Sequence, residues 1–140
     1  MNKHVVNTIW THGMQFETDN PSGKKIKIDL SPENGGENDG MHPKALMLSA
    51  LAGCTGVDVV MIINKMKLET TGFRIETIGY LSGSPQTYER VELIYHFYGK
   101  VLDQAKLERS VNMSVEKYCG VLKMFEQFAK IEVKIEYHER

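Results

Sequence analysis

Strict alternation of apolar and polar residues predicts β-strands near both ends of the chain. Residues 24–30, KKIKIDL, place Ile26, Ile28 and Leu30 on one face. The apolar segments at 4–10 and 13–19 are expected to form two strands before it. Residues 130–139 repeat the alternation, with four apolar side chains on one face: Ile131, Val133, Ile135 and Tyr137. We therefore expect three strands at the start of the chain and one at its end.

The stretch from Lys44 to about Met66 has a different pattern, helical but apolar almost all round. Pro43 suits the first helical position, where its missing N–H costs nothing. A helix apolar on every side is either buried or spans a membrane. Polar residues and glycines interrupt a length that is already minimal for a span, so we predict a central helix of a globular protein and no membrane partner. A monomer of 140 residues would struggle to cover such a helix, which suggests a partner subunit.

The remaining elements complete an α+β plan. Residues 31–43 are rich in proline, glycine and asparagine and are predicted to form a long loop. Residues 72–83 and 88–99 read as strands joined by a hairpin, and Asp103 is placed to cap a helix over 104–113. Ser114 begins a short helical piece, and a further helix is expected at 121–129. One domain, residues 1–140, with sheet packed on helix is the predicted organisation.

Charge and composition exclude several classes of function. The net charge of −1 offers no field for nucleic acid or anionic membranes. The first residues lack the apolar core of a signal peptide, so we expect a cytoplasmic protein. In a reducing cytosol its two cysteines are not expected to form a permanent disulfide. The histidines have no zinc-finger spacing, and no metal site is predicted: His4, His12, His42, His96 and His138.

The two cysteines are the candidate chemical groups. Cys54 lies between Gly53 and Gly56 in the long helix, and each glycine costs about 1 kcal/mol of helix stability relative to alanine. Close packing or access for a small molecule would compensate. Cys119 lies just before a new helical segment, where unpaired N–H groups favour a thiolate. In a redox cycle one thiolate attacks an electrophile, and the second thiol condenses with the resulting sulfenic acid to a disulfide.

The segments LMLSALAGCTGVDVVMII around Cys54 and LERSVNMSVEKYCGVLKMF around Cys119 resemble those of the OsmC/Ohr family, in particular its YhfA-like branch. The resemblance extends over essentially the whole chain. It implies an OsmC-like fold, with antiparallel sheets packed on a long central helix in an intertwined homodimer. It also implies a thiol site at the dimer interface that acts on small organic hydroperoxides, with Cys54 peroxidatic and Cys119 resolving. No bound cofactor is expected, and an external dithiol of the lipoyl type is the implied reductant.

The chain departs from the family at two positions that matter for this chemistry. Peroxidatic members use an arginine from the N-terminal strands, but the first arginine here is Arg74. They also use a glutamate near the start of the central helix, where this chain has Lys44, ten residues before Cys54. Lys44 and His42 are the candidates for electrostatic support of the thiol in place of that pair. Lysine is a poorer clamp than arginine, because it is a point charge rather than a planar fork.

Three functions therefore remain open. The first is a thiol-dependent reductase of organic hydroperoxides that uses Cys54 and then Cys119. The second is a binding module that keeps the interface pocket and holds a small apolar or thiol-bearing ligand, which the missing arginine and glutamate favour. The third is a thiol-exchange protein that reacts with disulfides rather than peroxides.

Overall fold

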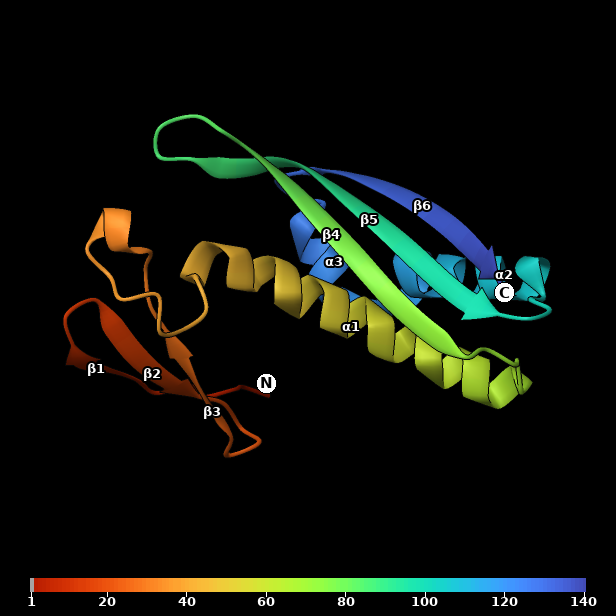
Figure 1. The fold of residues 1–140 in the computed structure, drawn as a ribbon, viewed down its shortest axis with the longest axis horizontal. Helices are drawn as coiled ribbons and strands as arrows, with labels where there is room; N and C mark the ends of the chain where they lie inside the picture. The colour runs from red at the N-terminus through yellow and green to blue at the C-terminus, as the bar shows by residue number, and fades with distance from the viewer. Residues whose placement is uncertain (1) are drawn as a thin grey trace. The chain divides into compact units, whose positions relative to one another are not determined.

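The computed structural model describes residues 2–140, which form two compact units that divide between Met47 and Leu48. Each unit is described by itself, and Figure 1 gives the order of their elements along the chain. The prediction of a single domain over residues 1–140 stays a prediction. The α+β class is confirmed, with two three-stranded sheets and three α-helices among the described residues.

The first unit is an antiparallel sheet of β1 (Thr8–His12), β2 (Gln15–Asp19) and β3 (Lys25–Ile28), in that order. The three predicted N-terminal strands are thus confirmed, although the first begins later than expected. Large apolar side chains of this sheet are exposed within the described chain, including Ile9, Trp10 and Ile26.

The predicted loop after β3 is built around one buried carboxylate. Asp29 accepts hydrogen bonds from the backbone N–H groups of Leu30, Glu37 and Asp39, at 2.8, 3.2 and 3.1 Å. The bond from Asp39 is the largest cause that lowers the pKa of Asp29. A short 3-10 turn, η1 (Pro32–Asn34), begins the loop. A Cβ at Gly36 would lie 2.0 Å from the Leu30 carbonyl oxygen, so only glycine fits this approach.

Helix α1 (Pro43–Met66) has the bounds that the apolar run predicts. Its buried residues recur every fourth position: Leu51, Thr55, Val59 and Ile63. Other apolar side chains of the same helix are exposed, with Val57 at 61% and Met61 at 65%. By length and composition alone α1 is the one described helix that could cross a membrane. Its Thr55 and Asp58, however, are hydrogen-bonded to Ser114, which anchors α1 in the core of the second unit.

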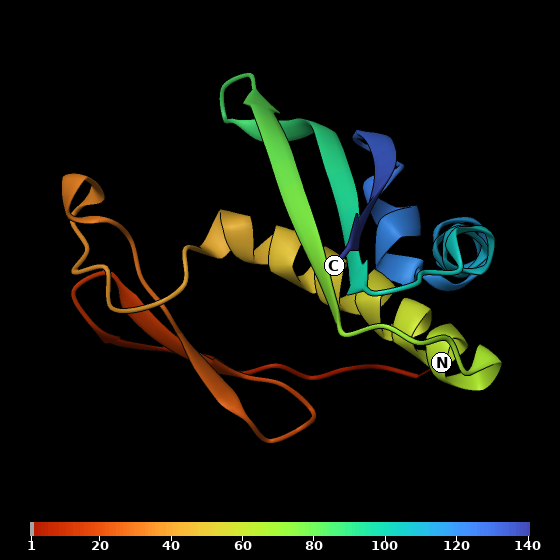
Figure 2. The ribbon, with the colours of Figure 1, turned by 45° about the vertical axis from the view of Figure 1, so that its right-hand side comes forward.

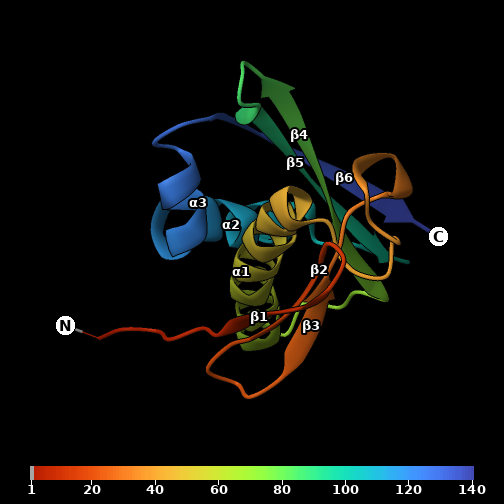
Figure 3. The same cartoon turned by 90° about the vertical axis from the view of Figure 1, so that its left-hand side faces the viewer.

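The second unit packs helices on one face of a sheet. The sheet has the order β4 (Gly72–Ser82), β5 (Thr87–Gly99), β6 (Lys130–Glu139). In Figures 2 and 3, α1, α2 (Gln104–Met113) and α3 (Gly120–Phe125) lie on the same side of it. Tyr95 and Phe97 of β5 point to this side and are fully buried. The alternate side chains of β5, among them His96 and Tyr98, point to the opposite face of the sheet.

The direction of the last strand corrects the prediction of antiparallel sheets. β4 and β5 are antiparallel, but β5 and β6 are parallel, with Arg90 opposite Lys130 and Gly99 opposite Glu139. A parallel pair needs a long crossover between its strands. The segment from Lys100 to Ala129 provides it and contains α2, the π-helical turn η2 (Ser114–Tyr118) and α3.

The helix starts in this crossover follow the expected chemistry. Asp103 caps α2 by accepting a hydrogen bond from the backbone N–H of Lys106 at 3.2 Å, as predicted. Ser114 begins a short helical piece, as predicted, and this piece is the π-helical η2, whereas α3 ends at Phe125, earlier than the predicted residue 129.

Candidate functional site

The second unit brings together the two thiols, which are 65 residues apart in the sequence. Cys54 projects from the middle of α1, and Cys119 is the residue that caps α3. Cys54 packs against the buried core that contains Cys119, and it is near enough to raise the pKa of the Cys119 thiol. Both cysteines are free, Cys54 half-buried and Cys119 only 5% exposed. The pair is thus asymmetric, with one accessible and one enclosed sulfur.

The environment of Cys119 keeps its sulfur protonated. Burial is the largest cause that raises the pKa of the Cys119 thiol, to about 12, and Cys54 and Asp58 add to the rise. The backbone N–H of Leu122, which donates to Cys119 Sγ at 3.4 Å, lowers the pKa but does not outweigh burial. At neutral pH Cys119 is therefore a thiol, suited to respond to an oxidised partner rather than to attack first.

A chain of buried hydroxyl groups runs beside the thiols. Thr55 Oγ1 shares hydrogen bonds with Tyr95 Oη at 2.8 Å and with Ser114 Oγ at 2.7 Å. Ser114 Oγ also lies 2.9 Å from Asp58 Oδ2, to which it donates. We call Tyr95, Thr55, Ser114 and Asp58 the hydroxyl network. It links β5, α1 and η2, and it fixes the helix that carries Cys54 against the turn that leads to Cys119.

The π-helical turn explains how Ser114 reaches this position. In η2 the N–H of Cys119 donates to the carbonyl of Ser114 at 2.9 Å, five residues earlier. Such turns occur often at functional sites, because they displace side chains from the α-helical positions. Here Ser114 faces α1, and Cys119 follows in an extended conformation that ends the turn.

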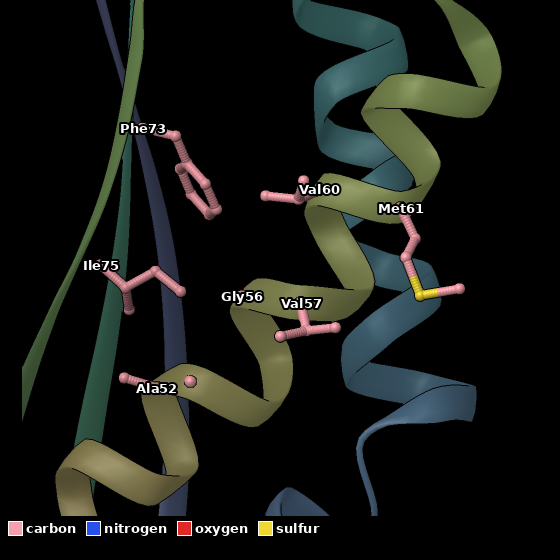
Figure 4. Close-up of a pocket in the computed structure, with 8 residues that line it drawn as sticks. Ala52, Gly56, Val57, Val60, Met61, Phe73 and Ile75 are labelled. Atoms are coloured by element: carbon pink, nitrogen blue, oxygen red, sulfur yellow. The ribbon is translucent and has the colours of Figure 1, made fainter. Parts of the chain in front are cut away.

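Two apolar spaces flank α1 in this unit. One is a groove of about 820 Å³ between α1, α2 and η2, whose walls are Asp58, Met61, Ile62, Lys65, Met66, Arg109, Met113 and Tyr118. Neither cysteine is among these wall residues, but Asp58, one helical turn from Cys54, is a wall residue whose charge acts on the Cys119 thiol. The other space, of about 520 Å³, lies between α1 and β4, where Phe73 and Ile75 face Gly56 and Val60 (Figure 4).

The glycines beside Cys54 are not alike. A Cβ at Gly56 would come within 3.3 Å of Ile75 Cδ1, so this glycine allows close approach to β4. A Cβ at Gly53 would meet nothing within 4 Å in the described chain. Both line the space shown in Figure 4. The helix cost of these glycines was expected to be offset by close packing or by access for a small molecule. Gly56 has the close packing, and Gly53 has open space beside it.

The predicted supporting cations lie in the other unit. His42 Nε2 is hydrogen-bonded to Asn38 Oδ1 at 3.0 Å, within its own loop. Lys44 is in the first turn of α1, before the division between the units. Support of the thiols by either residue stays a prediction.

Several site residues were not foreseen from the sequence. Thr55, Ser114 and Tyr95 are ordinary residues in helix and strand patterns, and only their contacts connect them. Arg109 lies on α2 and lines the groove of about 820 Å³ along α1. The helical period placed it on α2, but no sequence signal could indicate that this face of α2 lines a groove along α1.

Comparisons with known proteins agree with this geometry. The family model described as OsmC-like protein matches residues 36–134. Protein YhfA of Escherichia coli K12 is 29% identical over 123 residues, which cover 87% of this chain and 89% of that protein. The crystal structure of a hypothetical protein from Aquifex aeolicus VF5 has a TM-score of 0.85 and 28% identity, with 100% and 99% of the two chains covered. An organic hydroperoxide resistance protein OsmC from Legionella pneumophila, at 16% identity, shares the fold with a TM-score of 0.67 over 97% and 98% of the chains.

Proposed function

The chain belongs to the OsmC/Ohr family, and on that premise we propose that it is a thiol-dependent redox protein that reduces organic hydroperoxides through Cys54 and Cys119. The observation that carries the proposal is the packing of the half-buried Cys54 against the buried core that contains Cys119, within one unit. Structural relatives named as organic hydroperoxide resistance proteins give the reaction class.

The asymmetry of the pair assigns the order of the steps. The Cys54 thiolate attacks the outer oxygen of the peroxide, the O–O bond breaks, and the leaving alkoxide takes a proton and departs as an alcohol. Cys54 is then a sulfenic acid. Cys119 attacks the Cys54 sulfur, its proton leaves with the hydroxyl group as water, and a Cys54–Cys119 disulfide forms. An external dithiol, for which we propose the lipoyl type, returns two electrons and two protons.

The groove along α1 is the proposed site for the organic part of the peroxide. Its methionines and Ile62 offer an apolar wall, and Asp58 is the wall residue whose charge acts on the Cys119 thiol. Arg109 and Lys65 line the same groove. Arg109 is the one arginine among the wall residues of this groove, so it is the residue to test in place of the missing N-terminal arginine.

We further propose a homodimer in the reducing cytoplasm. The free thiols suit that compartment. The exposed apolar side chains of α1, Val57 and Met61 above all, supply a face for a second copy. Val57→Lys is expected to give a monomer in sedimentation velocity, whereas Lys100→Glu, an exposed loop change, keeps the dimer. A wild-type protein that sediments as a monomer would overturn this part of the proposal.

The test of the activity is the intact mass of the reduced protein before and after one equivalent of an organic hydroperoxide, with hydrogen peroxide in parallel. We expect a rapid loss of two hydrogens per chain, faster with the organic peroxide. Cys119→Ser is expected to stop at one added oxygen on Cys54, and Cys54→Ser is expected to show neither change. Oxygen added only to methionines in all three proteins would overturn the proposal.

One observation favours a second function, a binding module. Burial, with a smaller contribution from the Asp58 charge, raises the pKa of the Cys119 thiol, which slows its attack on an oxidised Cys54. A binding module would bind an apolar or thiol-bearing ligand equally well in the wild type and in Cys54→Ser. A thiol-exchange protein would instead form mixed disulfides with small thiols and consume little peroxide.

A further inference from the structure

A group of histidine and glutamate side chains lies on the face of the sheet opposite the thiol site. His96 of β5 and Glu136 of β6 are direct neighbours across the parallel pair, and His138 is two residues beyond Glu136 on the same face. The facing atoms of the three residues, one from each side chain, all lie within 4.8 Å of one another. His96 is 5% exposed and is therefore fixed in the sheet, whereas the side chains of His138 and Glu136 are 28% and 55% exposed.

The hydrogen bonds of this group leave acceptors facing a common point. His96 Nε2 lies 3.1 Å from Glu76 Oε1 and donates its proton to that carboxylate, which leaves Nδ1 as an acceptor. His96 Nδ1 is 2.9 Å from His138 Nε2 and 3.5 Å from Glu136 Oε2. The proton on His138 Nε2 can make a good hydrogen bond to only one of its two neighbouring acceptors, His96 Nδ1 and Glu136 Oε2. A cation could be bound by His96 Nδ1, His138 Nε2 and the Glu136 carboxylate at the same time.

From this arrangement we infer a site for a borderline divalent metal ion, Zn²⁺ in the first instance, bound by His96 Nδ1, His138 Nε2 and the Glu136 carboxylate. Imidazole and carboxylate are ordinary zinc ligands, at about 2.0–2.2 Å. Two nitrogens of a tetrahedral zinc ion are about 3.3 Å apart at those lengths, so the rings need to separate by only a few tenths of an ångström. The ion takes the place of the shared proton at His138 Nε2, and that proton moves through solvent to His138 Nδ1, so the ring stays neutral.

The contact with Glu76 is the strongest argument for a metal site over a simple hydrogen-bonded cluster. Metal-binding histidines usually donate the second ring N–H to a carboxylate, which fixes the tautomer and the ring orientation. His96 has this arrangement already. Tyr98 stacks on the His138 ring, with centroids 4.6 Å apart, and holds the second ligand in place.

The charges around the site allow a dication. Glu76 and Glu136 supply two carboxylates, and Arg74 lies beside the first of them at 3.9 Å. The Arg140 guanidinium lies over the Tyr98 ring, 5.6 Å from its centroid. With three ligands from the protein, the fourth position of a tetrahedral ion is left for water. The ion would tie β6 to β5 and so stabilise the parallel edge of the sheet.

The experiment uses the full chain with Cys54→Ser and Cys119→Ser, because thiols also bind zinc. Isothermal titration with Zn²⁺ is expected to give one ion per chain, with a rise in the melting temperature. His138→Gln is expected to weaken binding at least about tenfold, and Glu76→Gln to weaken it by a smaller factor. His138 is 28% exposed, so its replacement is the gentler of the two histidine changes, and the melting temperature without metal checks the fold.

A matched control is His12→Gln, which removes a surface histidine 3.6 Å from Glu37 in the other unit. It is expected to leave the zinc affinity unchanged. Co²⁺ bound by the thiol-free protein should give a visible spectrum without sulfur-to-metal bands, and His138→Gln should abolish it. Absence of binding at 0.1 mM Zn²⁺, or a zinc affinity that is the same with and without His138→Gln, would overturn the inference.

Discussion

The hydroxyl network predicts that one buried serine holds the two thiol-bearing elements together. Ser114 is fully buried, and its hydroxyl is the only link that joins Thr55 to Asp58 within the network. Ser114→Ala removes a neutral hydrogen bond, worth about 1 kcal/mol, and a bond to a carboxylate, worth about 1.5–3 kcal/mol when fully buried. Asp58 is half-buried, so water replaces part of the second bond. Together we expect a loss of about 2 kcal/mol in the free energy of unfolding.

Urea unfolding measures this loss, with reductant present and at one fixed protein concentration. With a slope of about 1–3 kcal/mol per molar, the midpoint should fall by roughly 1 M. The matched control is Ser110→Ala. Ser110 is equally buried, but its hydroxyl donates only to the Leu107 carbonyl of its own helix, so we expect at most about 1 kcal/mol.

A double-mutant cycle with Thr55→Val separates the bond from the loss of packing. The coupling free energy of the Ser114 and Thr55 changes should be about 1 kcal/mol, because each change alone already breaks the 2.7 Å contact. A Ser114→Ala loss below about 0.5 kcal/mol, or no larger than that of Ser110→Ala, would refute the reasoning that the network holds these elements together.

Two further predictions concern stability. Gly79→Ala should lower the free energy of unfolding by about 1–3 kcal/mol, because the added Cβ would lie 2.5 Å from the buried Tyr88 ring. Gly120→Ala is the control and should change nothing, since its Cβ would meet no atom within 4 Å. Equal losses in urea unfolding would contradict the prediction. The raised pKa values of Cys119 and Tyr95, each about 12, mean that the unfolded chain loses these protons first, so stability should fall as pH rises above about 9. The free energy of unfolding, measured between pH 8 and 11, should fall less steeply in the variants, by roughly 1 kcal/mol per pH unit. The difference should begin at about pH 9 for Cys119→Ser and at about pH 10 for Tyr95→Phe. The same pH dependence in both variants as in the wild type would count against the assignment.

The elements that the sequence predicted well are those whose signals are local. Pro43 and the apolar run fix α1, and the alternation in residues 130–139 fixes β6. Asp103 caps α2 through a contact three residues away. In each case the stabilising groups are close together in the sequence, so one segment contains the whole argument.

The features that the sequence did not predict all depend on contacts between residues that are far apart in the sequence. Alternation sets which residues of β6 face the core but not the direction of its neighbour, and the parallel pairing followed from the crossover that returns the chain to β5. The contact between Cys54 and Cys119 was expected through the family resemblance, not through any spacing rule. His96 and His138 lie 42 residues apart in the sequence, and only strand pairing places His96 Nδ1 2.9 Å from His138 Nε2.

The position of β6 also has a consequence for how the second unit is assembled during synthesis. β5 is the middle strand, and one of its two neighbours is β6, made 30 residues after β5 ends. Until β6 leaves the ribosome, the hairpin of β4 and β5 has an open edge that carries the most buried strand of the unit. Pairings over such distances form slowly. The nascent chain therefore passes through a state in which β5 is exposed to other strands, and a chaperone that shields that edge would raise the yield of folded protein.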